Sequence, residues 1–331
     1  MNKRKRLIDI FLIFIITFIS LPLSVLGLWF TNKTVTLPGD TTMVTDVIEV
    51  KGASNYAGSF STIYVISMDH STMLQNLIVD AIGYGEVSDM PKHYLHFSQR
   101  ELNLMGKIQY NSALELSIIN AYTLASKENP NISFSYRLKS LAISFYYENM
   151  PFKIGDEIIG INGIDIKDSQ FIPSFNNRKP GDKLTILRDN KNIEIILTEE
   201  NLNKFYFEPY YDIQYAEVYP KFQVNASKTG GPSGGFIRAL ALYNSLTTYD
   251  YTKGLKIAGT GTIDIKGRVG KIGGIKEKIL AAFKDDVDIF LCPLDNYEEA
   301  LSQYNRIRGK ERMQLYPVAT LEEALEVLKN A

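Results

Sequence analysis

Residues 230–235 read Gly-Gly-Pro-Ser-Gly-Gly, and residues 273–278 read Gly-Gly-Ile-Lys-Glu-Lys; both belong to the stretch from Lys228 to Lys278 that decides the fold. The first segment stands before an apolar, helix-like run, so Ser233 is expected at the start of a helix. Unpaired N–H groups and a partial positive charge at such an end suit the oxyanion of an acyl-transfer reaction. Glycines carry no Cβ, so an extended substrate could approach this serine closely.

A serine nucleophile needs a base, and the second segment offers two lysines, Lys276 and Lys278. Burial can lower the pKa of a lysine from about 10.4 toward neutrality, which leaves an amine that accepts a proton. Helical geometry does not separate the two, because each lies roughly 80° from the apolar stripe that begins at Ile275. A histidine base is the alternative, but all three histidines precede Ser233 by well over a hundred residues.

These motifs resemble the proteolytic domain of Lon-type serine proteases. Gly-Pro-Ser-Gly-Gly matches the nucleophile motif of that family, with Gly234 where alanine is usual. The second segment matches a motif whose last residue is the catalytic lysine, so the resemblance implies a Ser–Lys dyad of Ser233 and Lys278. It also implies that Thr260, in Ala-Gly-Thr-Gly-Thr, lies beside the dyad. Gly231 and Gly234 are expected to support the site through close approach of substrate and backbone N–H groups.

A basic cluster from Lys3 to Arg6 precedes an apolar run from Leu7 to Phe30. About 20 apolar residues span a bilayer, so residues 1–32 are predicted to be a cytoplasmic stub and a transmembrane anchor. Positive charge favours the cytoplasmic side, and the rest of the chain is therefore expected outside. A cleaved signal peptide is the alternative, although its apolar region would be shorter and no convincing small-x-small cleavage pattern is present.

Three further regions complete the predicted α+β architecture. Residues 33–131 are expected to form an N-terminal α/β region that packs with the protease unit, including a helix over residues 98–127 with a break at Gly106. Residues 132–200 are expected to form a small β domain. Residues 205–331 alternate strands and helices, as expected for a Lon-type proteolytic α/β domain.

The small β domain shows a pattern of short strands and tight turns. Gly155-Asp156 predicts a turn, Glu157 to Ile161 a strand, and Asn162-Gly163 a hairpin turn. Further strands are expected at residues 183–188 and 193–197. This order resembles a PDZ domain of the bacterial, protease-associated kind, and PDZ domains bind extended peptides by adding a strand to a sheet edge. The link before Gly155 is shorter than is usual in that family, so a spacer that holds the protease off the membrane is the alternative.

Several functional classes find little support. The net charge of −1 gives no electrostatic footprint for nucleic acid. The single cysteine, Cys292, excludes an internal disulfide and is expected in a buried strand. His93 and His96 have no further ligands at a workable spacing, so neither a metal site nor a cofactor is expected. Gly259-Thr-Gly261 lacks the third glycine of a dinucleotide motif, and no Gly-Lys-Ser/Thr phosphate loop occurs, which argues against ATP binding.

Together these features predict an ATP-independent serine endopeptidase, held by a single span on the extracellular face of a bacterial membrane. Its substrates would be exported peptides or flexible, unfolded protein segments. Ring-forming members of the resembled family leave a homo-oligomer open. One alternative is a catalytically silent surface interaction protein that combines a PDZ-like domain with a protease fold. Another is an esterase or other acyl hydrolase that uses the same dyad.

Overall fold

The computed structural model describes residues 3–53, 56–227 and 230–331, with side chains from residue 11 onward. Lys228 and Thr229, which open the glycine-rich stretch, lie outside the described residues, as do the first two residues of the predicted anchor. The chain divides into two compact units. The first comprises Met1–Pro38 and Val65–Leu95, and the second comprises Gly39–Tyr64 and His96–Ala331.

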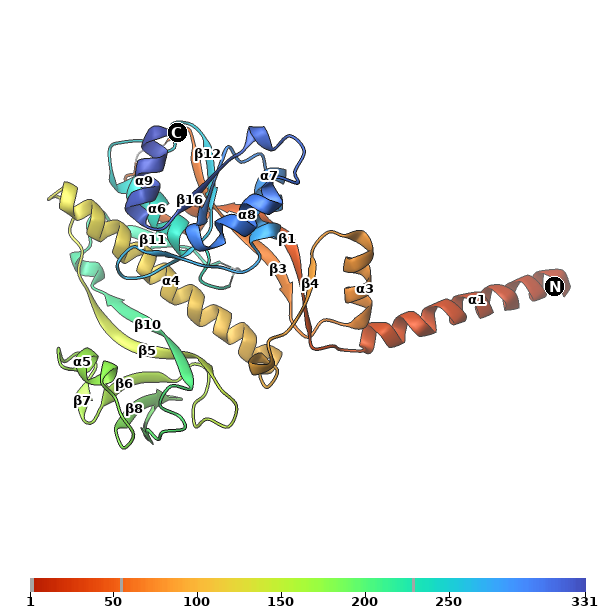
Figure 1. Cartoon of the computed structure of the whole chain (residues 1–331), viewed down its shortest axis with the longest axis horizontal. Helices are drawn as coiled ribbons and strands as arrows, with labels where there is room; N and C mark the ends of the chain where they lie inside the picture. Colours follow the sequence, from red (N-terminus) through yellow and green to blue (C-terminus); the bar gives the residue numbers. More distant parts are fainter. Residues whose placement is uncertain (1–2, 54–55, 228–229) are drawn as a thin grey trace. The chain divides into compact units, whose positions relative to one another are not determined.

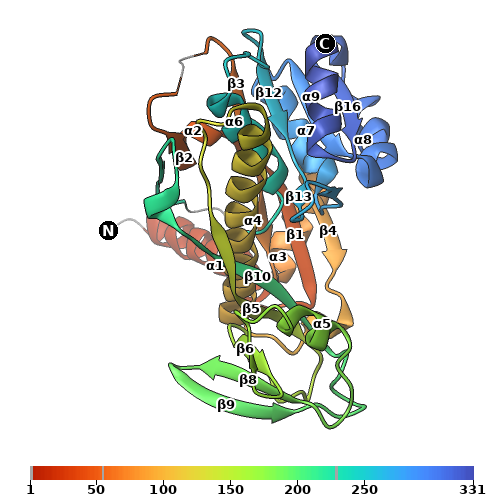
Figure 2. The ribbon, with the colours of Figure 1, turned by 90° about the vertical axis from the view of Figure 1, so that its left-hand side faces the viewer.

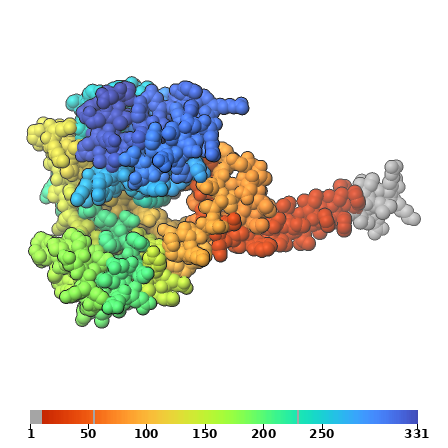
Figure 3. Space-filling view, viewed as in Figure 1, coloured from red at the N-terminus to blue at the C-terminus, as the bar shows by residue number. Residues whose placement is uncertain are grey.

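The first unit begins with an apolar helix, α1 (Lys3–Leu28). Its window Phe11–Leu28 has a mean hydropathy of 2.5 and is 0% buried, so the helix is long and apolar enough to cross a membrane by length and composition. Figure 3 shows these side chains uncovered on the face drawn. After α1 the chain enters β1 (Lys33–Met43), which pairs antiparallel with β4 (Glu86–Asp89) through residues 33–36.

The second helix of this unit is α3 (Met73–Ile82; Figure 1). It was not expected from the sequence patterns described above. The helix begins after Thr72, whose hydroxyl accepts the N–H of Gln75 while the Gln75 side chain accepts the N–H of Thr72. This capping box satisfies two donors at the helix start and contributes about 1 kcal/mol. The helix ends at Gly83, whose left-handed φ of 66° favours glycine.

The second unit is built on a mixed sheet in which strands lie in the order β16, β15, β12, β3 and β1. Strand β12 runs parallel to both β3 and β15, and β15 runs parallel to β16. Strands β1 and β3 contribute residues to both units. The other strands of this sheet are β3 (Ser59–Met68), β12 (Lys256–Gly259), β15 (Ile289–Pro293) and β16 (Gln314–Val318). The accompanying helices are α6 (Gly235–Leu246), α7 (Ile275–Lys284), α8 (Tyr297–Tyr304) and α9 (Leu321–Asn330). The expected mixture of strands and helices is confirmed.

Helix α4 (Gln99–Glu128) packs beside α6 in the larger core (Figure 2). The predicted break at Gly106 is wrong, because the helix runs through this residue without interruption. A glycine costs a helix only about 1 kcal/mol relative to alanine, and the packing of a long helix offsets that cost. Side chains on both sides of the predicted boundary at residue 205 share this core, among them Ile48, Leu116, Tyr122, Phe236, Leu240 and Tyr243. The domain boundaries themselves stay predictions.

A second sheet of this unit has the strand order β10, β5, β6, β8, β9. Its elements are β5 (Tyr136–Tyr146), β6 (Glu157–Ile161), β7 (Ile164–Asp165), α5 (Phe171–Asn176), β8 (Lys183–Arg188), β9 (Lys191–Ile196) and β10 (Phe205–Ile213). The strands expected at 157–161 and 183–188 are confirmed, and so is the turn between β6 and β7, where Asn162 and Gly163 have φ angles of 51° and 81°. The sheet has a core of its own, which includes Ile143, Ile158, Phe171 and Leu184. Its PDZ-like character stays a prediction.

Short elements complete the second unit. They are α2 (Val44–Val47), β2 (Ile48–Val50), β11 (Phe222–Val224), β13 (Thr262–Ile263), β14 (Val269–Gly270) and the 3-10 turns Tyr215–Glu217, Leu294–Asn296 and Lys310–Arg312; a further 3-10 turn of the first unit is Lys92–Tyr94. Cys292 is fully buried in β15, as its apolar surroundings predict. Burial raises the pKa of its thiol to about 12, so the residue packs as a small apolar group.

Candidate active site

Ser233 lies in the turn that leads into α6. The helix begins at Gly235 with Gly234 as its N-cap residue, and Ser233 is half-buried. Gly231 has a φ of 82°, which favours glycine, and its N–H donates to the carbonyl of Gly106 at 2.8 Å. Among the described residues, no carbonyl accepts the N–H of Ser233 or of Gly234. Both donors lie at the N-terminal end of α6, where backbone N–H groups suit a developing oxyanion.

Lys278 lies in the first turn of α7, and only 2% of it is exposed. Its Nζ lies 2.8 Å from Ser233 Oγ and 2.8 Å from the carbonyl oxygen of Ile63. The third neighbour is Thr260 Oγ1, at 3.1 Å. The structure thus brings together three residues that the sequence motifs single out: Ser233, Lys278 and Thr260.

Three oxygen atoms surround Nζ, and an ammonium would donate to all three, whereas the neutral amine has two N–H donors and one lone pair. The carbonyl of Ile63 can only accept. The hydroxyl of Thr260 also accepts from Nζ, because its own proton goes to the backbone carbonyl of Ser233 at 3.1 Å. Both N–H groups are then engaged, and the lone pair of Lys278 faces the hydroxyl of Ser233.

The electrostatic surroundings favour the same neutral form. The pKa of Lys278 is lowered to about 7, chiefly by burial and further by the positive charge of Arg238. Desolvation penalises a charged amine, and a nearby cation penalises it again. At neutral pH a large share of Lys278 is consequently an amine, as a general base requires.

Arg238 lies one turn into α6 and is only 3% exposed. Its guanidinium packs over the ring of Tyr110, 4.6 Å from the ring centroid, and its Nε and Nη1 have no hydrogen-bond partner within the described part of the chain. A Cβ at Gly234 would lie 2.7 Å from Arg238 Nη2. The end of the arginine side chain thus occupies the space that an alanine at this position would need.

A cleft of about 630 Å³ opens next to the nucleophile turn. Its lining comes from α4, β10, the β13–β14 hairpin and Pro232, the residue before Ser233. One wall carries Glu208, whose pKa burial raises to about 7 and which accepts a hydrogen bond from Ser144 Oγ at 3.4 Å. A cleft of this size can hold several side chains of an extended peptide.

The two other candidate bases lie elsewhere. Lys276 is half-buried on α7, and its ammonium lies 3.6 Å from the carboxylate of Glu299. Within the described residues no hydrogen bond joins Ser233 to a histidine; His96 instead packs against the rings of Phe97 and Tyr146. The geometry therefore pairs the serine with Lys278.

Two groups of the site were not expected from the sequence. The carbonyl of Ile63 comes from β3, far along the chain from the motifs, and a backbone carbonyl leaves no signal in a sequence. Arg238 could have been noticed, because it is a charge inside an otherwise apolar helix whose Phe236, Leu240 and Tyr243 all turn to the core.

Comparison with known proteins identifies the domain that holds this site. The profile of the Lon protease (S16) C-terminal proteolytic domain matches residues 192–331. A Lon-type proteolytic domain is therefore present in this chain.

Individual Lon proteases are similar to part of the chain. The Lon protease of Campylobacter jejuni is 36% identical over 101 residues, which is 30% of this chain and 12% of that relative. The Lon protease of Mycoplasmopsis agalactiae is 30% identical over 159 residues, 46% of this chain and 16% of the relative. The Lon protease of Buchnera aphidicola is 38% identical over 104 residues, 31% of this chain and 13% of the relative. The chain thus spans only a small part of the length of these relatives.

Proposed function

We propose that this protein is a serine endopeptidase in which Ser233 and Lys278 form the catalytic dyad. One observation carries the proposal: a buried lysine amine lies 2.8 Å from the hydroxyl of Ser233 while its two N–H groups are directed elsewhere. The proteolytic domain over residues 192–331 supports the same class of enzyme.

In the proposed reaction, Ser233 Oγ attacks the carbonyl carbon of the scissile peptide and its proton passes to Lys278 Nζ. The negative charge on the carbonyl oxygen is stabilised by the N–H groups of Ser233 and Gly234. The C–N bond then breaks, and Lys278 returns the proton to the leaving amine. A water molecule then attacks the acyl carbon and gives a proton to Lys278; the bond from that carbon to Ser233 Oγ breaks, and Lys278 returns the proton to Oγ. Thr260 engages one N–H of the amine and so keeps its lone pair directed at Ser233.

We propose further that the enzyme is a single-pass membrane protein whose catalytic part is extracellular. Support comes from the apolar window of α1 and from the basic cluster Lys3 to Arg6 before it. Hydrolysis is proposed to need no nucleotide, since the sequence has no Gly-Lys-Ser/Thr phosphate loop. Without an unfolding motor, short exported peptides and flexible protein segments would be the favoured substrates.

The small sheet from β5 to β10 is proposed to be a PDZ-like domain. The order of its strands and the hairpin turn at Asn162-Gly163 support this assignment. Its strand β9 lies at a sheet edge, where an extended peptide could add a strand. Binding of a peptide there would bring substrate to the proteolytic domain.

The proposed function is tested with the full chain in lipid nanodiscs. A fluorophosphonate probe should label Ser233, as located by mass spectrometry, and an unfolded protein should be cleaved without nucleotide. Failure of both reactions would overturn the proposal in favour of a silent interaction protein. Labelling accompanied by hydrolysis of esters, but not of peptides, would instead indicate an acyl hydrolase.

A further inference from the structure

Helix α3 presents an apolar face to the outside of the first unit. We define the α3 apolar face by the residues at positions i, i+3, i+4, i+7 and i+8 of one stripe: Leu74, Leu77, Ile78, Ala81 and Ile82. Leu77 is 46% exposed, Ile78 47% and Ile82 69%. The opposite side of the helix is packed inward through Asn76 and Val79, which are 5% and 8% exposed. The arrangement is amphipathic, but the exposed side is the apolar one.

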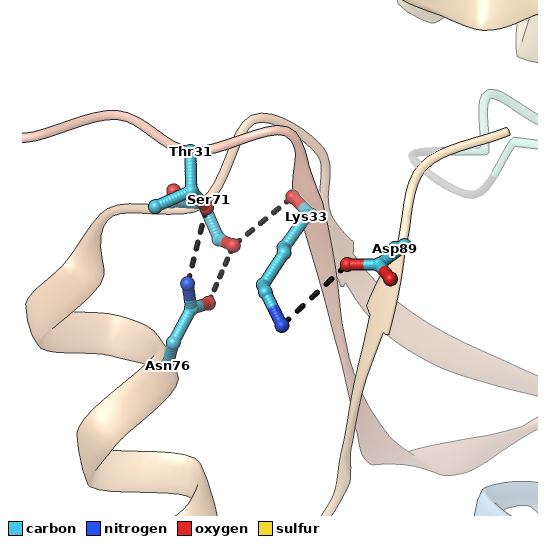
Figure 4. Close-up of polar contacts among 5 residues, drawn as sticks. All are labelled: Thr31, Lys33, Ser71, Asn76 and Asp89. Carbon is cyan, nitrogen blue, oxygen red and sulfur yellow. Dashed lines mark hydrogen bonds and ion pairs between the residues drawn. The ribbon is translucent and has the colours of Figure 1, made fainter. Parts of the chain in front are cut away.

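The start of α3 is tied by hydrogen bonds to the segment that leaves α1. The N–H of Met73 donates to the carbonyl of Trp29, and both the N–H and the hydroxyl of Thr31 donate to the carbonyl of Ser71, at 2.8 and 2.7 Å. The side chain of Asn76 donates to Thr31 Oγ1 at 3.0 Å and accepts from Ser71 Oγ at 2.6 Å (Figure 4). This network holds α3 in one orientation at the end of α1.

The same stripe faces the end of α1. A Cβ at Gly27 would lie 3.7 Å from Leu74, which is the first residue of the α3 apolar face. Figure 1 shows α3 running across the direction of α1, beside its C-terminal end. A helix that lies across the end of a membrane-spanning helix runs along the membrane surface. The side of it that faces the spanning helix is then turned to the lipid.

We propose that α3 is an interfacial helix whose apolar face rests in the outer leaflet, as a second membrane contact beside α1. This inference rests on the proposed membrane anchor. Its support is the continuity of the two apolar surfaces: Trp29 and Phe30, 61% and 68% exposed, lie between the window of α1 and the start of α3. Aromatic side chains favour this depth of a bilayer. The only charged residue within α3 is Asp80, so apolar burial rather than attraction to anionic lipid would drive the contact.

A consequence concerns the catalytic unit. A single spanning helix leaves the exported part free to tilt and turn, whereas a second contact with the bilayer restricts the first unit to one orientation. Strands β1 and β3 continue from that unit into the catalytic one.

The test places a fluorescent label in the full chain in nanodiscs, through single cysteines at Ile78→Cys, Asp80→Cys and Ile15→Cys. The native Cys292 is fully buried and should not react. Quenching is measured with lipids brominated near the top of the acyl chain, because interfacial helices bury their apolar face about 5–10 Å deep. Iodide in the water phase is the second quencher. Asp80 is the matched control, since it is an exposed residue of the same helix.

The proposal predicts that lipid bromine quenches the label at position 78 several-fold more than the label at position 80, whether or not the lipid is anionic. Quenching at position 78 by iodide alone would show a water-exposed face and overturn the proposal. Protection from both quenchers would show that protein, such as a second copy of the chain, covers the face, and would overturn it as well. Position 15 reports separately on the anchor, with lipids brominated near the end of the acyl chain: without quenching by those lipids, the proposed anchor itself fails.

Discussion

Two cations of the second unit, half-buried Arg188 and buried Lys278, differ in their hydrogen-bond partners. Arg188 of β8 forms two hydrogen bonds with the carboxylate of Asp156, at 2.7 and 2.5 Å, and these bonds raise the pKa of the arginine. Lys278 of α7 has only uncharged oxygen atoms as hydrogen-bond partners within the described residues, and its pKa is lowered to about 7. The first cation stabilises the fold, whereas the second can give up its proton. Burial lowers the pKa of a lysine that has no counter-charge, whereas a carboxylate partner keeps a cation in its protonated form.

Arg238, like Lys278, is a cation of the site that pairs with no carboxylate among the described residues. An arginine stays protonated even when buried, so this residue cannot act as a base. It acts instead as a fixed positive charge that destabilises the protonated form of Lys278. The site therefore contains a base and a cation that keeps the base neutral, while the small sheet contains a cation held by a carboxylate.

The largest effect is expected from removal of the dyad. Ser233→Ala and Lys278→Met should each lower kcat/KM for an unfolded substrate by on the order of 10³-fold or more, and the double variant should lose little beyond either single one. Lys276→Met, at a half-buried position of the same helix whose side chain pairs with Glu299, is the matched control and should keep its activity. Turnover that survives either dyad variant would remove the proposed mechanism.

The next effect concerns the paired cation. Arg188→Met leaves the carboxylate of Asp156, whose side chain is 1% exposed, without its partner. The free energy of unfolding should fall by on the order of 3 kcal/mol, measured by thermal or denaturant unfolding of the full chain. The pH profile of the remaining folded enzyme should not move, because this pair does not touch the dyad. A shifted profile would contradict the separation of the two cations.

A smaller effect is expected for the fixed charge. Arg238→Met removes a positive charge that lowers the pKa of Lys278, so that pKa should rise. A rise of about one unit, equal to ~1.4 kcal/mol, would cost roughly tenfold in activity below pH 7 and little at high pH. The measurement is the acid limb of kcat/KM against pH, which should move upward. An acid limb that stays in place would show that burial alone sets this pKa.

The smallest effect is expected at the motif's unusual glycine. Gly234→Ala brings a methyl group to 2.7 Å from Arg238 Nη2, the flexible end of a side chain that can shift at modest cost. We expect a few-fold loss of kcat in the wild-type background and a smaller loss when Arg238→Met is already present. Equal losses in the two backgrounds would mean that these positions are not coupled.

Local signals account for the parts of the fold that could be predicted. The strands β6 and β8 were readable because each is followed by a residue pair that tolerates left-handed φ, Asn162-Gly163 after one and Asp189-Asn190 after the other. The site could be anticipated because Ser233 and Lys278 both lie within glycine-rich motifs at helix starts. Their catalytic roles stay predictions until the variants are measured.

Other features depend on contacts that a local pattern does not carry. The break expected at Gly106 is absent because tertiary packing overrides the weak preference of one glycine. The carbonyl of Ile63 reaches Lys278 only because β3 pairs with β12, a long-range register that the motifs do not encode. Helix α3 is different: its capping box from Thr72 to Gln75 and its apolar stripe were present in the sequence, so it could have been predicted.

The most direct test of the central claim is the rate at which a fluorophosphonate modifies Ser233 in the full chain, followed from pH 5 to pH 10. Below its pKa Lys278 is an ammonium with no lone pair for the serine proton, so the rate should be low at acid pH and rise with pH. The account predicts a midpoint near 7, where the pKa of Lys278 lies. A midpoint close to the ordinary lysine value of about 10.4, or a rate independent of pH, would contradict it.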